Sequence, residues 1–182
     1  VIVNGKPQTA CTQPVADGMI IENDTPELKE HRRNIIDMLF VEGNHMCMFC
    51  ERSGNCELQA LAYRLEILAP KYPYFFPDKP VDSSHRDIFI DLNRCILCGR
   101  CVNASKDIDK KGVFGFINRT INKQLAVNGG KLADTNISVA DKAADVCPVG
   151  AINKKGTAYS IPYGQRLYDK QPIGSDIEGR KK

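Results

Sequence analysis

The sequence predicts an α+β fold made of small units. Three observations favour it: two segments in which apolar residues recur at helical spacing, several short strand-like runs bounded by Gly or Pro, and cysteines gathered into two groups. The chain has 182 residues, of which 42% are hydrophobic and 26% are charged, as in ordinary globular proteins. It contains no Trp and only 7% aromatic residues, so we expect a mainly aliphatic core.

Residues 1–23 are predicted to form the end of a small β-rich unit. Residues 1–3 and 19–21 are strand-like, and an Asn-Gly and an Asp-Gly turn signal stand beside them. The unit is predicted to lack its beginning. The first residue is Val1 and not methionine, so the chain is interpreted as a fragment, a processed form or a sequence numbered from its first ordered residue.

Two helices are predicted in the next part of the chain. The first covers residues 24–42, where Asp24 or Thr25 can cap the helix, Pro26 suits its first turn and a Gly-Asn pair follows its end. The second covers residues 57–68 and carries its leucines on one face.

A Pro- and aromatic-rich linker at residues 69–80 predicts a boundary between two units. Beyond it we expect a strand at 88–92, a short helix at 101–108, a strand at 113–121, a helix at 137–146 and a strand near 159–161, ahead of a draped or disordered tail. The expected parts are 1–23, 24–80, 81–155 and 156–182.

Composition excludes several classes of function. The net charge of +3 and the absence of a basic stripe, apart from Arg180 and the two lysines after it, argue against nucleic acid. No run of about 18 apolar residues predicts a membrane span, and no export signal is present. We therefore expect a cytoplasmic location and no disulfides among the eight cysteines.

The second cysteine group gives the strongest chemical signal. Cys95, Cys98 and Cys101 form a C-x2-C-x2-C triplet, and Cys147 is followed by Pro148 in a distant C-P pair. This spacing is typical of bacterial ferredoxins, in which one loop supplies three thiolates to a [4Fe–4S] cluster and a Cys-Pro supplies the fourth. Zinc is the alternative, but structural zinc sites favour two separated pairs of ligands.

A ferredoxin with two clusters would carry further cysteines around this group. The position four after Cys101 is Ser105, and counting back from Cys147 gives Ile137, Ala140 and Ala143. The sequence therefore predicts one cluster here, with a packed helix in place of a second.

The first cysteine group has three thiols and a histidine. Cys47, Cys50 and Cys56 are one ligand short of a set of four, and His45 is the candidate for the fourth. Three cysteines and one histidine also make a structural zinc set, so zinc stays an alternative. His31, within a predicted helix, and His85, in a polar segment, are interpreted as ordinary surface histidines.

At these residues the chain resembles a known family. The run Cys-x2-Cys-Glu-Arg-Ser-Gly-Asn-Cys-Glu-Leu-Gln at 47–59 is similar to the His(Cys)3 [4Fe–4S] motif of the complex I large iron–sulfur subunit. Residues 10–19 resemble the end of the [2Fe–2S] domain of that family, and residues 94–101 and 147–152 resemble its ferredoxin-like domain. The early ending and residues 40–47 look most like the small diaphorase subunit of NAD-reducing, bidirectional [NiFe] hydrogenase.

The resemblance implies a fold and a ligand set. It implies the C-terminal part of a plant-type [2Fe–2S] ferredoxin domain, a small helical His(Cys)3 domain and a ferredoxin-like domain, with two [4Fe–4S] clusters. Two departures stand out. The usual family histidine, in H-x3-C, falls on Gly43, while His45 gives H-x-C; and Cys11 is the one [2Fe–2S] ligand present, so its three partners would lie upstream of Val1.

The resemblance also implies a function. Such a subunit relays electrons between a flavin- and NAD(H)-binding diaphorase subunit and the small and large subunits of a hydrogenase. No general base, nucleophile or phosphate-binding loop is apparent, so we expect no catalytic, flavin or NAD site of its own. The alternatives are a fragment of a complex I-type or formate dehydrogenase iron–sulfur subunit, and a zinc-binding structural or interaction module.

Overall fold

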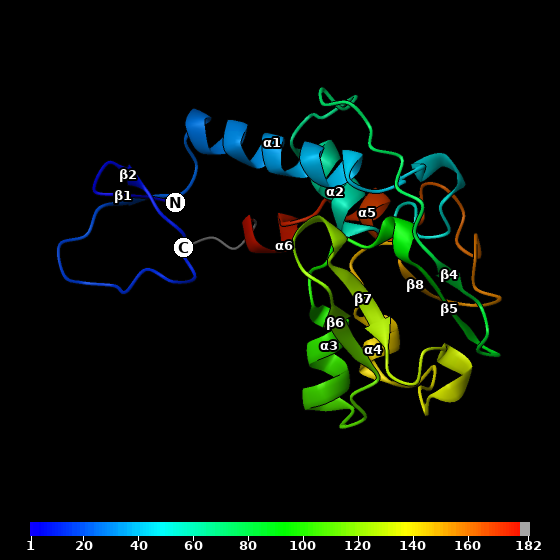
Figure 1. Cartoon of the computed structure of the whole chain (residues 1–182). Coiled ribbons are helices and arrows are strands. Elements are labelled where there is room, and N and C mark those ends of the chain that lie inside the picture. Colours follow the sequence, from blue (N-terminus) through cyan, green and yellow to red (C-terminus); the bar gives the residue numbers. More distant parts are fainter. Residues whose placement is uncertain (179–182) are drawn as a thin grey trace.

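The computed structural model describes residues 1–178 and shows a mixed helix and strand protein with three small sheets (Figure 1). Arg180 and the other basic residues at the very end, with residue 179, lie outside the described residues. The helices are α1 (Pro26–Val41), α2 (Glu57–Arg64), α3 (Arg100–Asn103), α4 (Lys142–Asp145), α5 (Leu167–Lys170) and α6 (Ser175–Glu178). The strands are β1 (Ile2–Val3), β2 (Lys6–Pro7), β3 (Ile21–Glu22), β4 (Val81–Asp82), β5 (Ile88–Asp91), β6 (Phe114–Ile117), β7 (Gln124–Val127) and β8 (Ile152–Lys154).

The N-terminal segment forms a three-stranded antiparallel sheet in the order β2-β1-β3. Ile2 and Val3 are buried in it, while much of the loop between β2 and β3 is exposed. In Figure 1 this blue segment extends to one side of the body that holds the other two sheets. The predicted short strands are thus confirmed.

Helix α1 begins and ends close to the predicted residues. The side-chain oxygen of Thr25 accepts a hydrogen bond from the backbone N–H of Leu28 at 3.2 Å, which satisfies one of the free donors of the first turn. Thr25, and not Asp24, is therefore the cap.

Helix α2 is shorter than predicted, so the expected end at residue 68 is wrong. Glu66 adopts a left-handed conformation (φ 57°), and the backbone N–H of Ile67 turns back to the carbonyl of Ala62 at 2.9 Å. This is the pairing that commonly closes a helix. Leu68 consequently lies 97% exposed instead of on the packed face.

The second half is built on two sheets. One has the antiparallel order β4-β5-β8, and the other is the hairpin β6-β7. The single strand expected at 113–121 is wrong, because Asn118 and Thr120 take left-handed conformations and turn the chain back into β7. The strand expected near 159–161 is also wrong: Tyr159 is left-handed, and the strand β8 comes earlier.

The helix expected at 137–146 is mostly absent and is reduced to the single turn α4. Asp109, from a distant segment, accepts hydrogen bonds from the backbone N–H groups of Lys142 and Ala143, both at 2.9 Å, and so supplies the acceptors for the first turn. Ahead of it, the Asp141 carboxylate bonds to the Ser138 N–H at 2.8 Å and holds a turn instead of a helix.

The core is aliphatic, as expected, and continues from α1 through β5 to α4. Ile88, Ile90, Leu132 and Val149 are among its most buried side chains. Cysteines of both groups belong to the same core cluster. The tail lies against residues 53–55: the N–H groups of Leu167 and Tyr168, both in α5, bond to the Asn55 side chain at 3.0 Å and to the Gly54 carbonyl at 2.9 Å. Of the two alternatives, the described residues fit a draped tail and not a disordered one, but the short helices α5 and α6 were not predicted.

Candidate metal centres

The second cysteine group lies where β5 ends. A 3-10 turn (Leu92–Arg94) leads into the loop, and left-handed conformations at Leu97 (φ 55°) and Gly99 (φ 75°) curl it before α3 begins. Glycine adopts such a conformation without strain. The loop thereby carries Cys95 and Cys98, and α3 carries Cys101 in its first turn.

The four thiols of this group lie close enough to influence one another. Burial raises the pKa of the Cys101 thiol to about 12, and the charges of Cys147, Cys95 and Cys98 add to the shift. Burial likewise raises the pKa of Cys147, although the backbone N–H groups of residues 149, 151 and 152 bond toward its sulfur. Thiols in such surroundings stay protonated until a cation displaces the proton. The N–H groups are positioned to stabilise a metal-bound thiolate.

The positions that a two-cluster ferredoxin would fill with cysteine are used for packing. Ser105 is buried and its hydroxyl accepts a hydrogen bond from the Val113 N–H at 2.7 Å. Ile137 and Ala143 are buried in the core, whereas Ala140 is exposed. The packed helix expected here is a loop followed by one turn.

The first cysteine group surrounds a small internal cavity. Cys47 lies in a 3-10 turn (Cys47–Phe49), and Cys56 is the residue from which α2 starts. The cavity is lined by His45, Cys47, Cys50 and Cys56, with Phe40, Arg94 and Gly150 among the other walls. Burial raises the pKa of Cys56 to about 12, against backbone hydrogen bonds from residues 58 and 59 that favour the thiolate.

His45 has the properties of an available metal ligand. Its Nε2 atom is buried without a hydrogen-bond partner, and its ring meets the edge of Phe40 with the centroids 5.5 Å apart. Burial, aided by the charge of Arg94, lowers its pKa to about 4, so the imidazole is neutral and offers a lone pair. An unpaired buried acceptor is costly in a folded protein, and a coordinated metal would satisfy it.

Gly43, at the usual histidine position of the family, gives His45 its space. A Cβ atom at residue 43 would lie 2.7 Å from His45 Nε2 and 2.8 Å from the Asn93 carbonyl oxygen. The shift from H-x3-C to H-x-C is therefore matched by a small residue at the vacated position. The donor set of the first group fits a cluster held by three thiolates and one imidazole.

The remaining candidates lie apart from both groups. Cys11 is exposed in the N-terminal segment. His31 pairs with Glu27 on the surface of α1 at 3.5 Å, and the ring of His85 accepts a hydrogen bond from the Asp87 N–H at 3.0 Å. Among the residues described, no three His, Cys, Asp or Glu side chains converge on a point that would hold a single metal ion.

The two cysteine groups are in direct contact, which the sequence did not reveal. A Cβ atom at Gly150, three residues after Cys147, would lie 2.7 Å from the sulfur of Cys50. The N–H of Glu57, next to Cys56, bonds to the Pro148 carbonyl at 2.8 Å. The backbone around one ligand of the second group therefore touches the ligand loop of the first.

Two arginines cross between the groups. Arg94, which precedes Cys95, bonds to the Glu51 carboxylate, and Arg100, which precedes Cys101, bonds to Glu57 through both Nη atoms at 2.6 and 2.7 Å. The two glutamates in turn follow Cys50 and Cys56. Each pair thus joins a residue beside a ligand of one group to a residue beside a ligand of the other.

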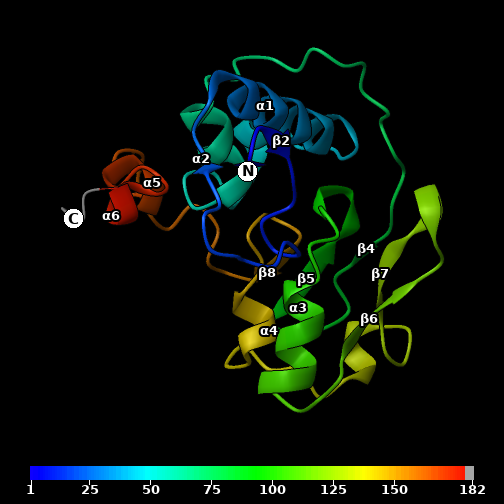
Figure 2. The same cartoon turned by 90° about the vertical axis from the view of Figure 1, so that its left-hand side faces the viewer.

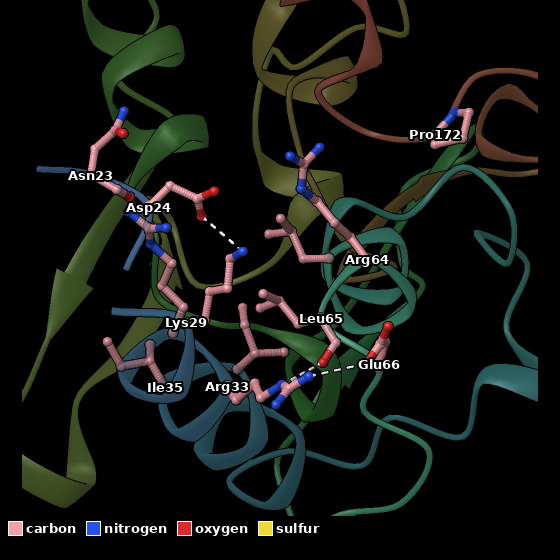
Figure 3. Close-up of a pocket in the computed structure, with 12 residues that line it drawn as sticks. Asn23, Asp24, Lys29, Arg33, Ile35, Arg64, Leu65, Glu66 and Pro172 are labelled. Carbon is pink, nitrogen blue, oxygen red and sulfur yellow. Dashed lines mark hydrogen bonds and ion pairs between the residues drawn. The ribbon is translucent and has the colours of Figure 1, made fainter. Parts of the chain in front are cut away.

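A separate groove of about 1000 Å³ lies between α1 and the end of α2 (Figure 3). Lys29 pairs there with Asp24 at 3.3 Å, and Arg33 pairs with Glu66 at 3.2 Å. None of the cysteines lines it.

Figure 2 shows α1 and α2 packed together above β5 and β8. Within residues 1–178, none of the helices has the length and apolar character needed to cross a membrane.

Two family patterns match the segments that carry the cysteines. Residues 32–70 match the "NADH-ubiquinone oxidoreductase-G iron-sulfur binding region", and residues 87–153 match the "NADH-quinone oxidoreductase subunit 3, ferredoxin-like domain". The first match contains the His45 group, and the second contains the Cys95 to Cys147 group. Both descriptions name iron–sulfur or ferredoxin modules, so [4Fe–4S] binding is indicated for this chain.

Relatives extend the similarity to the whole chain. The gamma chain of the NAD-reducing hydrogenase HoxS from Cupriavidus necator is 34% identical over 99% of this chain and 78% of its own length. The G chain of NADH-quinone oxidoreductase from Rickettsia prowazekii is 30% identical over 85% of this chain, but the match spans only 22% of that relative. A crystal structure of NAD+-reducing [NiFe]-hydrogenase in the H2-reduced state contains a chain with a TM-score of 0.89 and 41% identity, covering 93% of this chain and 73% of that one.

The predicted resemblance is thus confirmed. The match to the hydrogenase chain covers 99% of this chain and 78% of the relative. The match to the complex I chain covers 85% of this chain but 22% of the relative. The chain belongs to the family of the gamma chains of NAD-reducing hydrogenases.

Proposed function

We propose that this chain is an iron–sulfur electron-transfer subunit that holds two [4Fe–4S] clusters. Three thiolates and one imidazole hold the first, and four thiolates hold the second. The ligands are His45, Cys47, Cys50 and Cys56 for the first cluster and Cys95, Cys98, Cys101 and Cys147 for the second. The clusters supply the one-electron chemistry, and the chain supplies ligation, a fixed separation and the tuning of potential.

The observation that carries the proposal is the contact between the two groups. Gly150 and the Glu57–Pro148 hydrogen bond bring the backbone beside Cys147 against the ligand loop of the first group. Two separate structural zinc sites have no need of such contact, whereas two electron carriers must be close to exchange electrons. The backbone N–H groups directed at Cys147 support the same interpretation, because they stabilise thiolates bound to a cluster.

The N-terminal unit completes the proposal. Residues 1–23 are the end of a plant-type [2Fe–2S] domain in which Cys11 is one ligand. The further parts are a His(Cys)3 domain at 24–80, a ferredoxin-like domain at 81–155 and a tail from 156. An exposed cysteine in a surface loop has no packing role that would explain it, which favours ligation together with residues outside this sequence.

The relay runs between a flavin- and NAD(H)-binding diaphorase subunit and the small and large subunits of a [NiFe] hydrogenase. This follows the names of the relatives, one a chain of an NAD-reducing hydrogenase and the other a chain of an NAD+-reducing [NiFe]-hydrogenase. No substrate is converted on this chain. The proposed setting is a heteromeric complex in the cytoplasm.

Metal and sulfide analysis of the native complex tests the proposal. The two clusters predict about eight iron and eight labile sulfide ions from this chain, with two more of each if the [2Fe–2S] unit is complete. Reduction should bleach the visible absorption and produce signals in electron paramagnetic resonance (EPR). Stoichiometric zinc in a colourless chain would overturn the relay and support the structural module.

A further inference from the structure

One side chain of the second group reaches into the first. Arg94 directly precedes the ligand Cys95, yet its Nη1 atom lies 3.7 Å from the sulfur of Cys50, within hydrogen-bonding distance for sulfur. The same guanidinium bonds to the Glu51 carboxylate, and its Nε atom bonds to Asp91 at 2.9 Å. Three fixed contacts hold the arginine between the two cysteine groups.

The surroundings make the charge of Arg94 effective. Its side chain is 20% exposed and that of Asp91 13%, so water screens this site less than a surface ion pair. Burial lowers the pKa of Arg94, but the bonds to Glu51 and the charges of Cys50 and Asp91 outweigh it and raise the pKa overall. An arginine in any case keeps its charge at every physiological pH.

The backbone leaves a space shaped for this side chain. A Cβ atom at Gly150 would approach Arg94 Cδ to 3.3 Å and Nη1 to 3.4 Å, besides striking the sulfur of Cys50. Arg94 and His45 also line the same small cavity. Arg94 therefore faces two of the four ligands of the first group while it is attached to the loop of the second.

We infer that Arg94 is a positioning residue that raises the reduction potential of the first cluster. By its contacts with Cys50 and Glu51 it also joins the first ligand loop to the second, from which it projects. The inference rests on the proposed function. A cluster gains negative charge when it accepts an electron, so an N–H donor and a positive charge at Cys50 stabilise the reduced state more than the oxidised state. The first cluster is thereby set above the potential that its ligands alone would give.

The test is a redox titration of the complex, monitored by EPR, that measures the midpoint potential of the first cluster. It compares the wild type with Arg94→Gln, Glu51→Gln and the double variant. Arg94→Gln is expected to lower the midpoint potential of the first cluster, with about a tenfold fall in its reduced-to-oxidised ratio at the wild-type midpoint, which is about 59 mV for one electron. Glu51→Gln removes the compensating anion and is expected to raise the midpoint. The double variant is expected to return close to wild type.

Arg100→Gln is the matched control. Arg100 also precedes a ligand of the second group and pairs with a glutamate beside a ligand of the first, but it is 45% exposed and both Nη atoms engage Glu57. Its loss is expected to leave the first midpoint close to the wild-type value. Arg94→Lys keeps the positive charge but lacks the planar guanidinium group. We expect the midpoint potential of the first cluster in this variant to stay close to the wild-type value.

The outcomes separate the inference from the proposed function. Normal iron content with unchanged midpoints in Arg94→Gln and Glu51→Gln would overturn the inference and leave the relay intact. A wild-type complex without iron would overturn the relay itself. If Arg94→Gln does not retain its first cluster, the Glu51→Gln variant decides. A raised midpoint potential of the first cluster in that variant supports the charge effect, and an unchanged one contradicts it.

Discussion

The two cysteine groups each bring four candidate ligands together, but they draw them from different parts of the chain. The second takes its ligands from segments 46 residues apart in sequence, Cys101 and Cys147, and buries both of them in the core. The first takes all its ligands from one short loop, which leaves Met48 and Phe49 exposed at 77% and 70%. The second group therefore joins distant segments of the chain, while the first is closed within one loop, although Cys56 is buried in the same core.

The ligands at the two groups also differ in their donors. Cys147 in the second group and Cys56 in the first both receive backbone N–H groups, but the first group also contains His45, an unpartnered imidazole in a cavity. A backbone N–H donor persists in every substitution except one to proline, whereas any substitution of His45 removes the imidazole. We therefore expect side-chain substitutions to change the proposed first cluster more selectively than the second.

The largest expected effect comes from Cys147→Ser. Loss of this buried ligand removes the second cluster and leaves an unmatched polar group in the core, so the thermal midpoint should fall clearly and about four irons should be lost. Iron analysis and thermal unfolding of the purified complex measure both. Ser83→Ala, at an exposed position outside both groups, is the control. Equal losses in the two variants would contradict the assignment of Cys147 as a buried ligand of the second cluster.

His45→Ala should remove or convert the first cluster while sparing the second. Because the imidazole is the fourth ligand, about four irons or fewer should be lost, and the EPR signal of the second cluster should persist. His45→Cys offers a thiolate in its place and is expected to restore a cluster with a lower potential, since imidazole raises potential relative to thiolate. Wild-type spectra from His45→Ala would show that the ring is no ligand.

Gly43→Ala tests whether the glycine leaves the space that the His45 ring occupies. The new methyl group would lie 2.7 Å from Nε2 and 2.8 Å from a backbone oxygen, so the ring must move and the first EPR signal should change shape. The overpacking should cost about 1–3 kcal/mol of stability. Gly115→Ala is the control, because nothing lies within 4 Å of a Cβ atom there. An unchanged first signal in Gly43→Ala would remove the argument that this glycine makes room for a ligand.

The smallest effect is expected from Tyr159→Phe. The tyrosine hydroxyl donates a hydrogen bond to the Phe49 carbonyl at 2.7 Å and fastens the tail to the loop of the first group. Its loss should cost about 0.5–1.5 kcal/mol and raise hydrogen exchange in residues 47–50, without loss of iron. Tyr63→Phe, on an exposed face of α2, serves for comparison. Equal exchange in the two variants would show that the tail does not steady the loop.

Local patterns were predictable from the sequence, and long-range contacts were not. The spacing of the cysteines, the cap at Thr25 and the turn signals near Gly5 are all set by neighbours in the chain. The partners of Arg94 and Arg100 lie 43 residues away, so no motif reveals that these arginines join the groups.

The wrong predictions have the same cause. The helix expected at 137–146 has suitable residues, but Asp109 fixes where its one turn begins. The hairpin β6-β7 was predicted as one strand because its turn uses non-glycine residues, Asn118 and Thr120, in left-handed conformations. In each case tertiary contacts or an uncommon turn outweighed the local preference.

Anomalous diffraction from crystals of the native complex, recorded at the iron and zinc absorption edges, would locate the metal atoms at both cysteine groups. We predict two separate groups of iron atoms, one enclosed by His45, Cys47, Cys50 and Cys56 and the other by Cys95, Cys98, Cys101 and Cys147. A single zinc peak in either nest, or iron bound away from these sulfurs, would contradict the account of two neighbouring clusters.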